Sequence, residues 1–206
     1  MAKNILHKII RAYFQGKKSY LAEIRCKNKR TLDIGCGFGS FLKFDTDNFI
    51  GIEINDTAIE TGLKRGFKII KSSTENIPFE NNFFERIVAL QVIEHLTPIE
   101  AFKMFCEAER LLKEEGEFII STELDTNTFW NTFSHIKPYP PKSIYKLLRK
   151  DEDGLETFSK IKNLKAVEIY YSGRMFKNSF LNLLSQLTAN YLSVGRKNYT
   201  LIMKKI

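Results

Sequence analysis

The sequence predicts an α/β fold in which helices cover both faces of a mostly parallel sheet. Short apolar segments alternate along the chain with segments of helical periodicity, which is the pattern of parallel strands joined by helices. No internal repeat and no Pro/Gly/Ser-rich linker divides the 206 residues, a length that suits one core. We therefore expect a single domain over residues 1–206.

Five apolar segments in the first part of the chain are predicted strands. They are Arg30–Gly35, Asn48–Ile54, Gly66–Ser72, Glu85–Gln91 and Glu117–Thr122. A helix is predicted over Asp56–Arg65, between the second and third of these strands. Ligands of such sheets bind at the carboxyl ends of the strands, so we expect the site there.

The helix that begins after Thr97 has the clearest start. Thr97 suits the N-cap, Pro98 suits the first helical position, and Glu100 completes a capping box. An apolar stripe follows, made of Ile99, Phe102, Phe105, Ala108, Leu111 and Leu112. Gly116 is expected to end the helix.

The last part of the chain changes in character. Helices are predicted over Pro140–Lys150 and Phe176–Leu192, and strands over Ala166–Gly173 and Tyr199–Ile206. A strand–helix–strand unit of this kind can add an antiparallel edge to a parallel sheet.

Charge is unevenly distributed along the chain. Residues 1–30 hold nine Lys/Arg and one acid, and residues 142–206 hold thirteen and five, so each end carries +8. Residues 31–141 hold ten Lys/Arg and eighteen acids and carry −8. Basic ends fit an anionic partner such as nucleic acid, a phosphorylated acceptor or a membrane surface, but basic composition is a weak signal, and solvated lysines on surface helices are the favoured explanation.

The cysteines and the lengths of the apolar runs indicate the cellular compartment. Three scattered cysteines, Cys26, Cys36 and Cys106, argue against a disulfide framework and a zinc site and favour a reduced cytoplasm. We expect no signal peptide and no transmembrane segment, because no apolar run is long enough.

The segment TLDIGCGFGSF, residues 31–41, places three glycines directly after the first strand. The spacing Gly35-x-Gly37-x-Gly39 is neither the dinucleotide fingerprint nor a phosphate-binding P-loop. Asp33 lies in the strand itself, and a buried carboxylate is costly unless it faces loop amides or a cation. S-adenosylmethionine fits these constraints, because it carries an ammonium and a carboxylate and no phosphate.

Over residues 30–123 the chain resembles the class I S-adenosylmethionine-dependent methyltransferases. LDIGCGFGS is similar to their first motif, FIGIEIND to their second strand, and EAERLLKEEGEFIIST to their later helix and fifth strand. STENIPFENNFFERIVALQVIEHL resembles the third and fourth motifs of a small-molecule subgroup that includes ubiquinone and menaquinone biosynthesis enzymes. The resemblance implies a Rossmann-like, doubly wound, seven-stranded sheet with an antiparallel edge strand.

The resemblance also implies roles for single residues in binding S-adenosyl-L-methionine and its product, S-adenosyl-L-homocysteine. Gly35, Cys36, Gly37 and Gly39 would lie against the methionine part of the cofactor. Asp33 would orient this loop and the amino group, although a structural buried acid is the alternative.

The ribose and adenine contacts would come from later segments. Glu53 would take both ribose hydroxyls, unless it is only a solvated acid at a strand end. Ile54 would lie against the adenine, and the backbone of Gln91 would line the methyl-transfer site. Ser73 stands where the subgroup often has an acid, so adenine contacts are expected from Ser73, Thr74 or Glu75.

Two histidines are the candidate catalytic residues. His95 follows the fourth strand, and His135 lies in FWNTFSHIKPYPPKSIYKLL, which is similar to an acceptor-binding segment of small-molecule methyltransferases. Either could accept a proton from the acceptor, but each could instead only fasten its loop. Phe129, Trp130, Phe133 and Tyr139 are expected to form an aromatic wall. Glu94 and His95 alone make a poor metal site, so no metal is predicted.

The resemblance divides the chain into three parts. Residues 1–29 would form a helical cap over the cofactor or acceptor, with an amphipathic helix at Ile5–Phe14 that could instead lie on a membrane. Residues 30–123 would form the cofactor-binding half, and residues 124–206 the acceptor side with the last strands.

The sequence is compatible with three functions. The first is methyl transfer to a small molecule, a sugar or a lipid-linked acceptor, which could be anionic. The second is methylation of RNA or protein through the basic ends. The third is a non-catalytic domain that binds the cofactor. The sequence does not indicate an oligomeric state.

Overall fold

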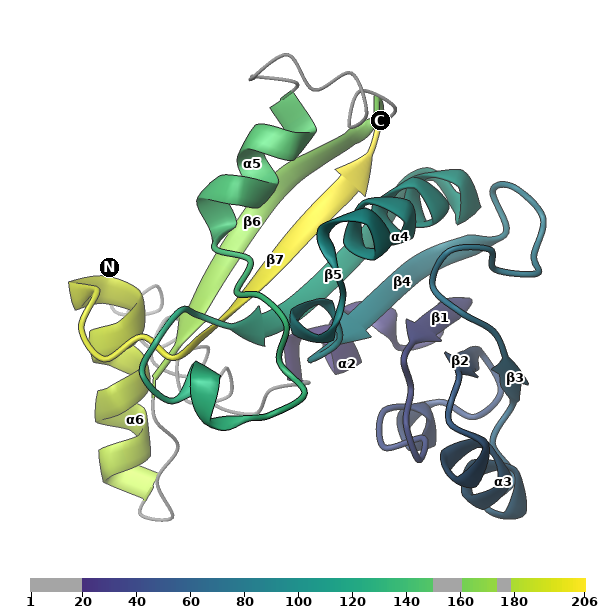
Figure 1. Ribbon diagram of the computed structural model, residues 1–206, viewed down its shortest axis with the longest axis horizontal. Coiled ribbons are helices and arrows are strands. Elements are labelled where there is room, and N and C mark those ends of the chain that lie inside the picture. The colour runs from purple at the N-terminus through teal and green to yellow at the C-terminus, as the bar shows by residue number, and fades with distance from the viewer. Residues whose placement is uncertain (1–19, 150–160, 174–178) are drawn as a thin grey trace.

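The structure is a computed structural model, and it describes residues 20–149, 161–173 and 179–206 (Figure 1). These residues form one seven-stranded sheet in the order β3-β2-β1-β4-β5-β7-β6. The strands are β1 (Thr31–Ile34), β2 (Phe49–Glu53), β3 (Ile69–Lys71), β4 (Phe84–Leu90), β5 (Leu112–Glu123), β6 (Leu164–Ser172) and β7 (Asn198–Lys205). The predicted α/β fold with a mostly parallel sheet is confirmed.

The sheet mixes strand directions only toward the β6 end. Strands β1 to β5 pair in parallel, whereas β7 is antiparallel to both β5 and β6. The predicted antiparallel strand is therefore present, and it lies one place in from the edge that β6 forms. The N-terminal part of the chain, 30–123, and the part after it contribute to the same sheet.

Helices cover both faces of the sheet. They are α2 (Tyr20–Cys26), α3 (Asp56–Lys64), α4 (Pro98–Leu111), α5 (Pro141–Arg149) and α6 (Ser179–Leu187), with short turns η1 (Leu42–Phe44), η2 (Ile93–His95), η3 (Phe129–Asn131) and η5 (Thr188–Leu192). Figure 1 shows α4 and α5 lying along the sheet over β4 to β6. The predicted helix at Ile5–Phe14 falls outside the described residues.

Alternate residues of the central strands build two separate cores. On β4, Ile87 and Ala89 join the cluster under α4, while Val88 joins the cluster under α2 and η1. This alternation is expected for a strand that is buried on both faces.

The α4 helix begins as predicted and ends earlier. Thr97 and Glu100 form the capping box, with Pro98 at the helix start. The helix ends at Leu111 rather than Gly116, because Leu112 is buried and pairs with Phe84 as the first residue of β5. The expected stop at Gly116 was therefore wrong, and this glycine lies in an irregularity of β5.

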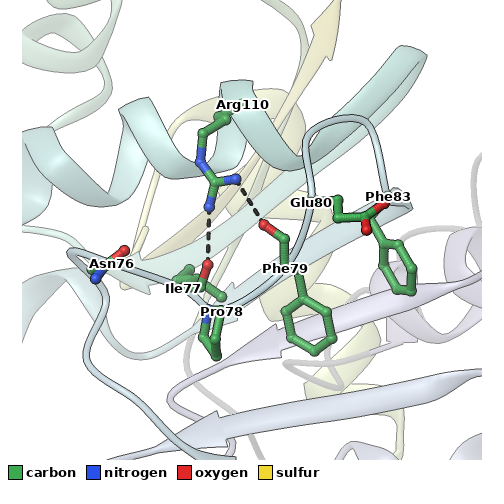
Figure 2. A pocket seen from close by; sticks show the side chains of 7 residues that line it. All are labelled: Asn76, Ile77, Pro78, Phe79, Glu80, Phe83 and Arg110. Carbon is green, nitrogen blue, oxygen red and sulfur yellow. Dashed lines mark hydrogen bonds between the residues drawn. The ribbon is translucent and has the colours of Figure 1, made fainter.

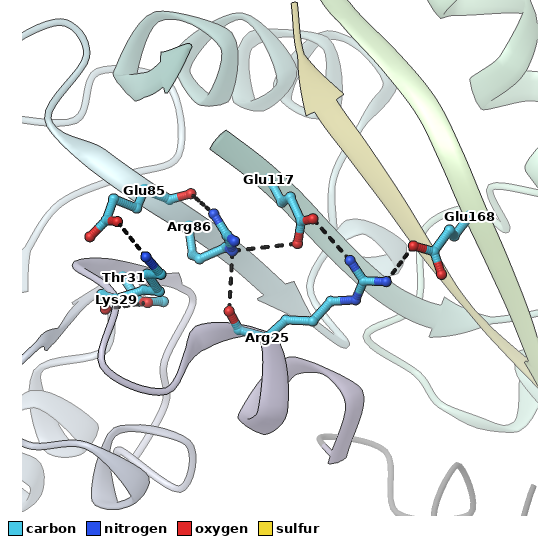
Figure 3. Close-up of polar contacts among 7 residues, drawn as sticks. All are labelled: Arg25, Lys29, Thr31, Glu85, Arg86, Glu117 and Glu168. Carbon is cyan, nitrogen blue, oxygen red and sulfur yellow. Dashed lines mark hydrogen bonds and ion pairs between the residues drawn. The ribbon is translucent and has the colours of Figure 1, made fainter. Parts of the chain in front are cut away.

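A polar network ties α2 to the sheet (Figure 3). The Arg25 guanidinium forms ion pairs with Glu117 of β5 and Glu168 of β6, and the Arg25 carbonyl accepts a bond from Arg86 of β4. One residue of α2 thus contacts three strands. Across the part of the chain that the structure describes, no helix is both long and apolar enough to cross a bilayer.

Candidate active site

The carboxyl ends of β1, β2, β4 and β5 meet at one rim of the sheet. Asp33 of β1 pairs in register with Gly51 of β2 and with Val88 of β4. The loops that leave these strands carry most of the residues predicted for the site.

The glycine loop packs tightly at its two ends and is open in its middle. Gly35, Gly37 and Gly39 all have left-handed φ angles, of 65°, 53° and 80°. A Cβ on Gly35 would lie 2.8 Å from Val92, and one on Gly39 would lie 2.3 Å from Phe67. A Cβ on Gly37 would meet nothing within 4 Å, so this backbone offers room to a ligand.

Cys36 lies in the glycine loop, but its thiol points into the protein. A Cβ on Gly51 would lie 2.4 Å from the Cys36 sulfur, so the side chain packs against β2. Burial raises the pKa of the Cys36 thiol to about 12, which keeps it protonated. Only the backbone of Cys36 is therefore left for the contact predicted with a cofactor.

Glu53 ends β2 and is bonded to the glycine loop. One carboxylate oxygen accepts the Gly37 N–H at 2.9 Å, and the other accepts those of Ile54 at 2.8 Å and Asn55 at 3.0 Å. Each oxygen of a carboxylate has further acceptor capacity, so hydroxyl groups can still bind. The Ile54 side chain beside it is mostly exposed.

Asp33 is 3% exposed and lies behind this loop. Burial raises the pKa of its carboxyl well above the ordinary value, and the charge of Glu53 adds to the rise. Within the described residues its carboxylate accepts no hydrogen bond, so the expected contact with loop amides is not found. Protonation offsets its burial in the free protein, and a bound cation would offset the burial of the ionised form.

The segment after β3 lies beside Glu53. The Ser72 N–H donates to the Glu53 carbonyl at 3.1 Å, and the Glu75 N–H donates to the Ser73 hydroxyl at 3.4 Å. The Glu75 carboxylate forms an ion pair with Lys103 of α4 at 2.9 Å. Of the predicted adenine contacts, Glu75 therefore already has a charged partner, while Ser73 and Thr74 follow the strand end directly.

Arg110 of α4 fixes the continuation of this segment (Figure 2). Its guanidinium donates to the carbonyls of Ile77 at 2.9 Å and Phe79 at 2.8 Å, and to Asn81 and Glu107. A pocket of about 570 Å³ opens here, and it is lined by Asn76, Ile77, Pro78, Phe79, Glu80, Phe83 and Arg110. Because these hydrogen bonds occupy the guanidinium, we interpret Arg110 as an anchor for the loop and do not interpret the pocket as an anion-binding site.

Gln91 leaves β4 in a strained conformation. Its φ is 60°, which is uncommon for a residue with a side chain, and its backbone N–H donates to the Ser121 carbonyl at 2.7 Å. Its side-chain amide donates to the same carbonyl at 3.0 Å. Strain of this kind clusters at functional sites, which fits the role predicted for Gln91 at the methyl-transfer position.

His95 and His135 are brought together, although forty positions separate them. Their ring centroids lie 4.9 Å apart at an angle of 71°. His95 Nδ1 lies 3.0 Å from the Ser134 carbonyl, and His135 Nδ1 lies 2.8 Å from the Phe129 carbonyl. Both rings fasten their loop, and both leave Nε2 outside these contacts.

Glu94 completes this cluster and was not among the predicted site residues. Its carboxylate is 1% exposed and accepts a bond from the Thr122 hydroxyl at 2.7 Å. Burial raises the pKa of the Glu94 carboxyl, while the hydrogen bonds and the nearby histidines act in the opposite direction. An acid inside the apolar VIEHL segment was the available sequence signal.

The expected aromatic wall is only partly formed. Phe129 is buried and its ring centroid lies 4.4 Å from that of His135, whereas the Trp130 and Phe133 side chains are largely exposed. Tyr139 is buried and its hydroxyl donates to the Leu96 carbonyl at 2.9 Å. Phe129 and Tyr139 are thus part of the packed interior, and only Trp130 and Phe133 of the four expected residues present an aromatic surface.

Comparison with known proteins agrees with this geometry. Residues 32–120 match the model of a family described as a methyltransferase domain. An uncharacterized protein of Methanocaldococcus jannaschii is 32% identical over 66% of this chain and 62% of its own length. A sterol 24-C-methyltransferase of Aspergillus fumigatus is 28% identical over 50% of this chain and 30% of its own length. A mouse protein named probable tRNA methyltransferase 9B is 29% identical over 43% and 20%.

The chain covers less than two thirds of the length of each of these relatives. Among solved structures, a SAM-dependent methyltransferase from Archaeoglobus fulgidus superposes with a TM-score of 0.64 over 97% of this chain and 99% of that one, at 20% identity. At this identity the likeness shows the fold. Residues 32–120 are thus similar to a methyltransferase domain, and the chain shares the Rossmann-like fold of the Archaeoglobus fulgidus protein.

Proposed function

We propose that this protein transfers a methyl group from S-adenosylmethionine to a small-molecule, sugar or lipid-linked acceptor by in-line displacement. The observation that carries the proposal is the pair of acids, Asp33 and Glu53, on the two sides of the glycine loop. An ammonium beside Asp33 would offset its burial, and the ribose diol would suit the two oxygens of Glu53. The open backbone at Gly37 leaves room between them.

The chain's own residues would supply binding and orientation, which can lower a barrier by about 7–11 kcal/mol. The methyl–sulfur bond breaks as the methyl–acceptor bond forms, and S-adenosylhomocysteine leaves as a neutral thioether. A hydroxyl acceptor must also lose its proton. His95 and His135, next to the Gln91 rim, are the groups proposed to assist that loss.

A small-molecule acceptor is supported by the sterol methyltransferase among the relatives and by the exposed Trp130 and Phe133 of the segment after β5. The basic ends and the tRNA methyltransferase relative favour RNA as the second candidate. Incubation with methyl-labelled cofactor and a fractionated extract separates them, since only an RNA product would be lost on ribonuclease treatment.

The cofactor site can be tested before the acceptor is known. By calorimetry we expect S-adenosylhomocysteine to bind with a dissociation constant of about 1–100 μM. Glu53→Ala should weaken binding by about 2–3 kcal/mol, because bonds to a charged group are worth about 1.5–3 kcal/mol each. Glu60→Ala removes the same charge from an exposed site on α3 and should bind as the wild type does. Wild-type affinity in a folded Glu53→Ala protein would overturn the placement.

A further inference from the structure

We propose that Glu94, His95 and His135 form a binding site for a divalent first-row transition-metal ion at the acceptor side of the active site. The role of the ion in holding an acceptor oxygen rests on the proposed function. Its binding does not, because the three side chains define the site without the cofactor.

The three side chains are close enough to share one ion. One donor atom from each lies within 4.8 Å of the donor atoms of the other two. A tetrahedral ion with bonds of about 2.0–2.2 Å would hold its donors about 3.4 Å apart. The donor atoms counted here would therefore approach one another by up to about 1.4 Å on binding.

The hydrogen bonds of the two imidazoles leave Nε2 of each ring available to bind a metal ion. A backbone carbonyl can only accept, so the bonds to Ser134 and Phe129 place the proton of each ring on Nδ1. Each Nε2 then carries a lone pair. Histidines that bind metals characteristically donate the other ring N–H to a carbonyl or a carboxylate.

Glu94 would supply the negative charge of the site, and a hydrogen bond from a neighbouring residue holds its carboxylate in place. No lysine or arginine of the described residues forms an ion pair with this buried carboxylate, and a buried carboxylate is stabilised chiefly by a cation. One of its oxygens is held by Thr122, as metal-binding carboxylates usually are by a second residue.

The backbone joins the two segments that carry the ligands. The Glu94 carbonyl accepts the N–H groups of Ile136 at 2.9 Å and Lys137 at 3.4 Å, so the His135 loop is held against η2. Val92, just before η2, packs against Gly35 of the glycine loop. The cluster is thus held beside the loop proposed to bind the methyl donor.

The donor set indicates the kind of metal. Two imidazole nitrogens with one carboxylate suit zinc, iron or cobalt, whereas magnesium prefers oxygen ligands and keeps several waters. Three protein ligands leave a coordination position for an acceptor hydroxyl oxygen. With both imidazoles bound to the ion they would assist through it and not as bases, so the hydroxyl would release its proton to solvent as its oxygen bonds to the methyl carbon and the methyl–sulfur bond breaks.

The test uses untagged full-length protein, stripped of metal and titrated with Co²⁺ and then Zn²⁺. We expect one equivalent of Co²⁺ to give visible d–d absorption, Zn²⁺ to displace it and Mg²⁺ to leave it unchanged. His95→Gln, His135→Gln and Glu94→Gln should each weaken Zn²⁺ binding at least about 10-fold, since losing even an outer partner costs about 10–100-fold. His7→Gln changes the chain's third histidine and should bind metal as the wild type does.

The outcomes are distinct for the two proposals. Absence of a Co²⁺ spectrum in folded wild-type protein, or an unchanged spectrum in His135→Gln and His95→Gln, overturns the metal site. S-adenosylhomocysteine binding, measured on the same stripped samples, is expected to be unaffected by metal. Its absence would overturn the proposed function and leave the metal result standing.

Discussion

At the residue scale, Asp33 is a residue that selection for stability alone would not favour at its position. Its carboxyl is enclosed, accepts no hydrogen bond from the described residues and faces the charge of Glu53. Burial raises its pKa, so the folded protein holds a proton that the unfolded chain releases. A polar group of this kind is kept for a ligand and not for the free protein.

We expect Asp33→Asn to raise the melting temperature of the cofactor-free protein. A raised folded pKa means that the stability of the wild type falls as pH rises from about 4, the ordinary aspartate value, through the folded pKa. The gain from Asn should therefore be small near pH 4 and larger at pH 7. Thermal unfolding at both pH values measures it.

The same variant should bind S-adenosylhomocysteine more weakly, by about 1.5–3 kcal/mol, because a charged partner of the ammonium is lost. A gain in melting temperature that does not change with pH would contradict the raised pKa. Unchanged affinity would contradict the contact with the ammonium.

At the scale of the element, the segment after β3 is held in place by α4, a helix that comes later in the sequence. Arg110 of α4 donates to the backbone at Ile77 and Phe79, and Glu107 accepts the Ile77 N–H at 2.8 Å. A loop with few buried side chains of its own is thereby held next to Glu53. Its conformation is therefore set by α4 together with local hydrogen bonds such as that from the Glu75 N–H to the Ser73 hydroxyl.

Arg110→Ala should lower the free energy of unfolding by about 2–3 kcal/mol, since several bonds to one charged group are lost. We also expect about tenfold weaker S-adenosylhomocysteine binding, because the adenine segment loses its anchor. Lys103→Ala is the matched control. It removes a charge from the same helix and an exposed ion pair to the same segment, so less than about 1 kcal/mol should be lost. Urea unfolding and calorimetry give both quantities, and equal losses in the two variants would refute the anchor.

The helices and strands also differ in how well their positions could be predicted from the sequence. Strand positions and the start of α4 could be predicted, because periodicity and the Thr97 capping box are local signals. The end of α4 could not, since it depends on Leu112 pairing with Phe84 across the sheet. The contact between His95 and His135 could not be predicted either, because it depends on hydrogen bonds that the Glu94 carbonyl accepts from the loop containing His135.

At the scale of the whole molecule, Arg25 connects α2 to the two halves of the sheet. Its guanidinium is mostly enclosed and pairs with Glu117 and Glu168, which lie on either side of β7 (Figure 3). Removing one member of a partly buried pair of this kind is costly, because each acid then loses one of its charged contacts.

Arg25→Met should lower the free energy of unfolding by about 1–3 kcal/mol, since Glu117 and Glu168 would each lose an ion pair, although Arg86 remains 3.4 Å from Glu117. Lys64→Met removes one lysine from an exposed pair with Glu60 on α3 and should cost about 0–0.5 kcal/mol. Guanidinium unfolding of both variants measures the difference. In the Glu117→Gln background the cost of Arg25→Met should shrink, and an unchanged cost would show that the pair does not couple α2 to β5.

The position of β7 affects the order in which the sheet can be completed as the chain leaves the ribosome. β6 ends at Ser172 and β7 begins at Asn198, yet in the sheet β6 pairs only with β7. Twenty-six further positions (198 − 172) must be translated before β6 gains its partner, which takes about 1–5 s at about 5–20 residues per second. During that interval β5 presents an open parallel edge and β6 has no strand beside it. The nascent chain is then exposed to mispairing, and a chaperone that recognises strand edges would act in this interval.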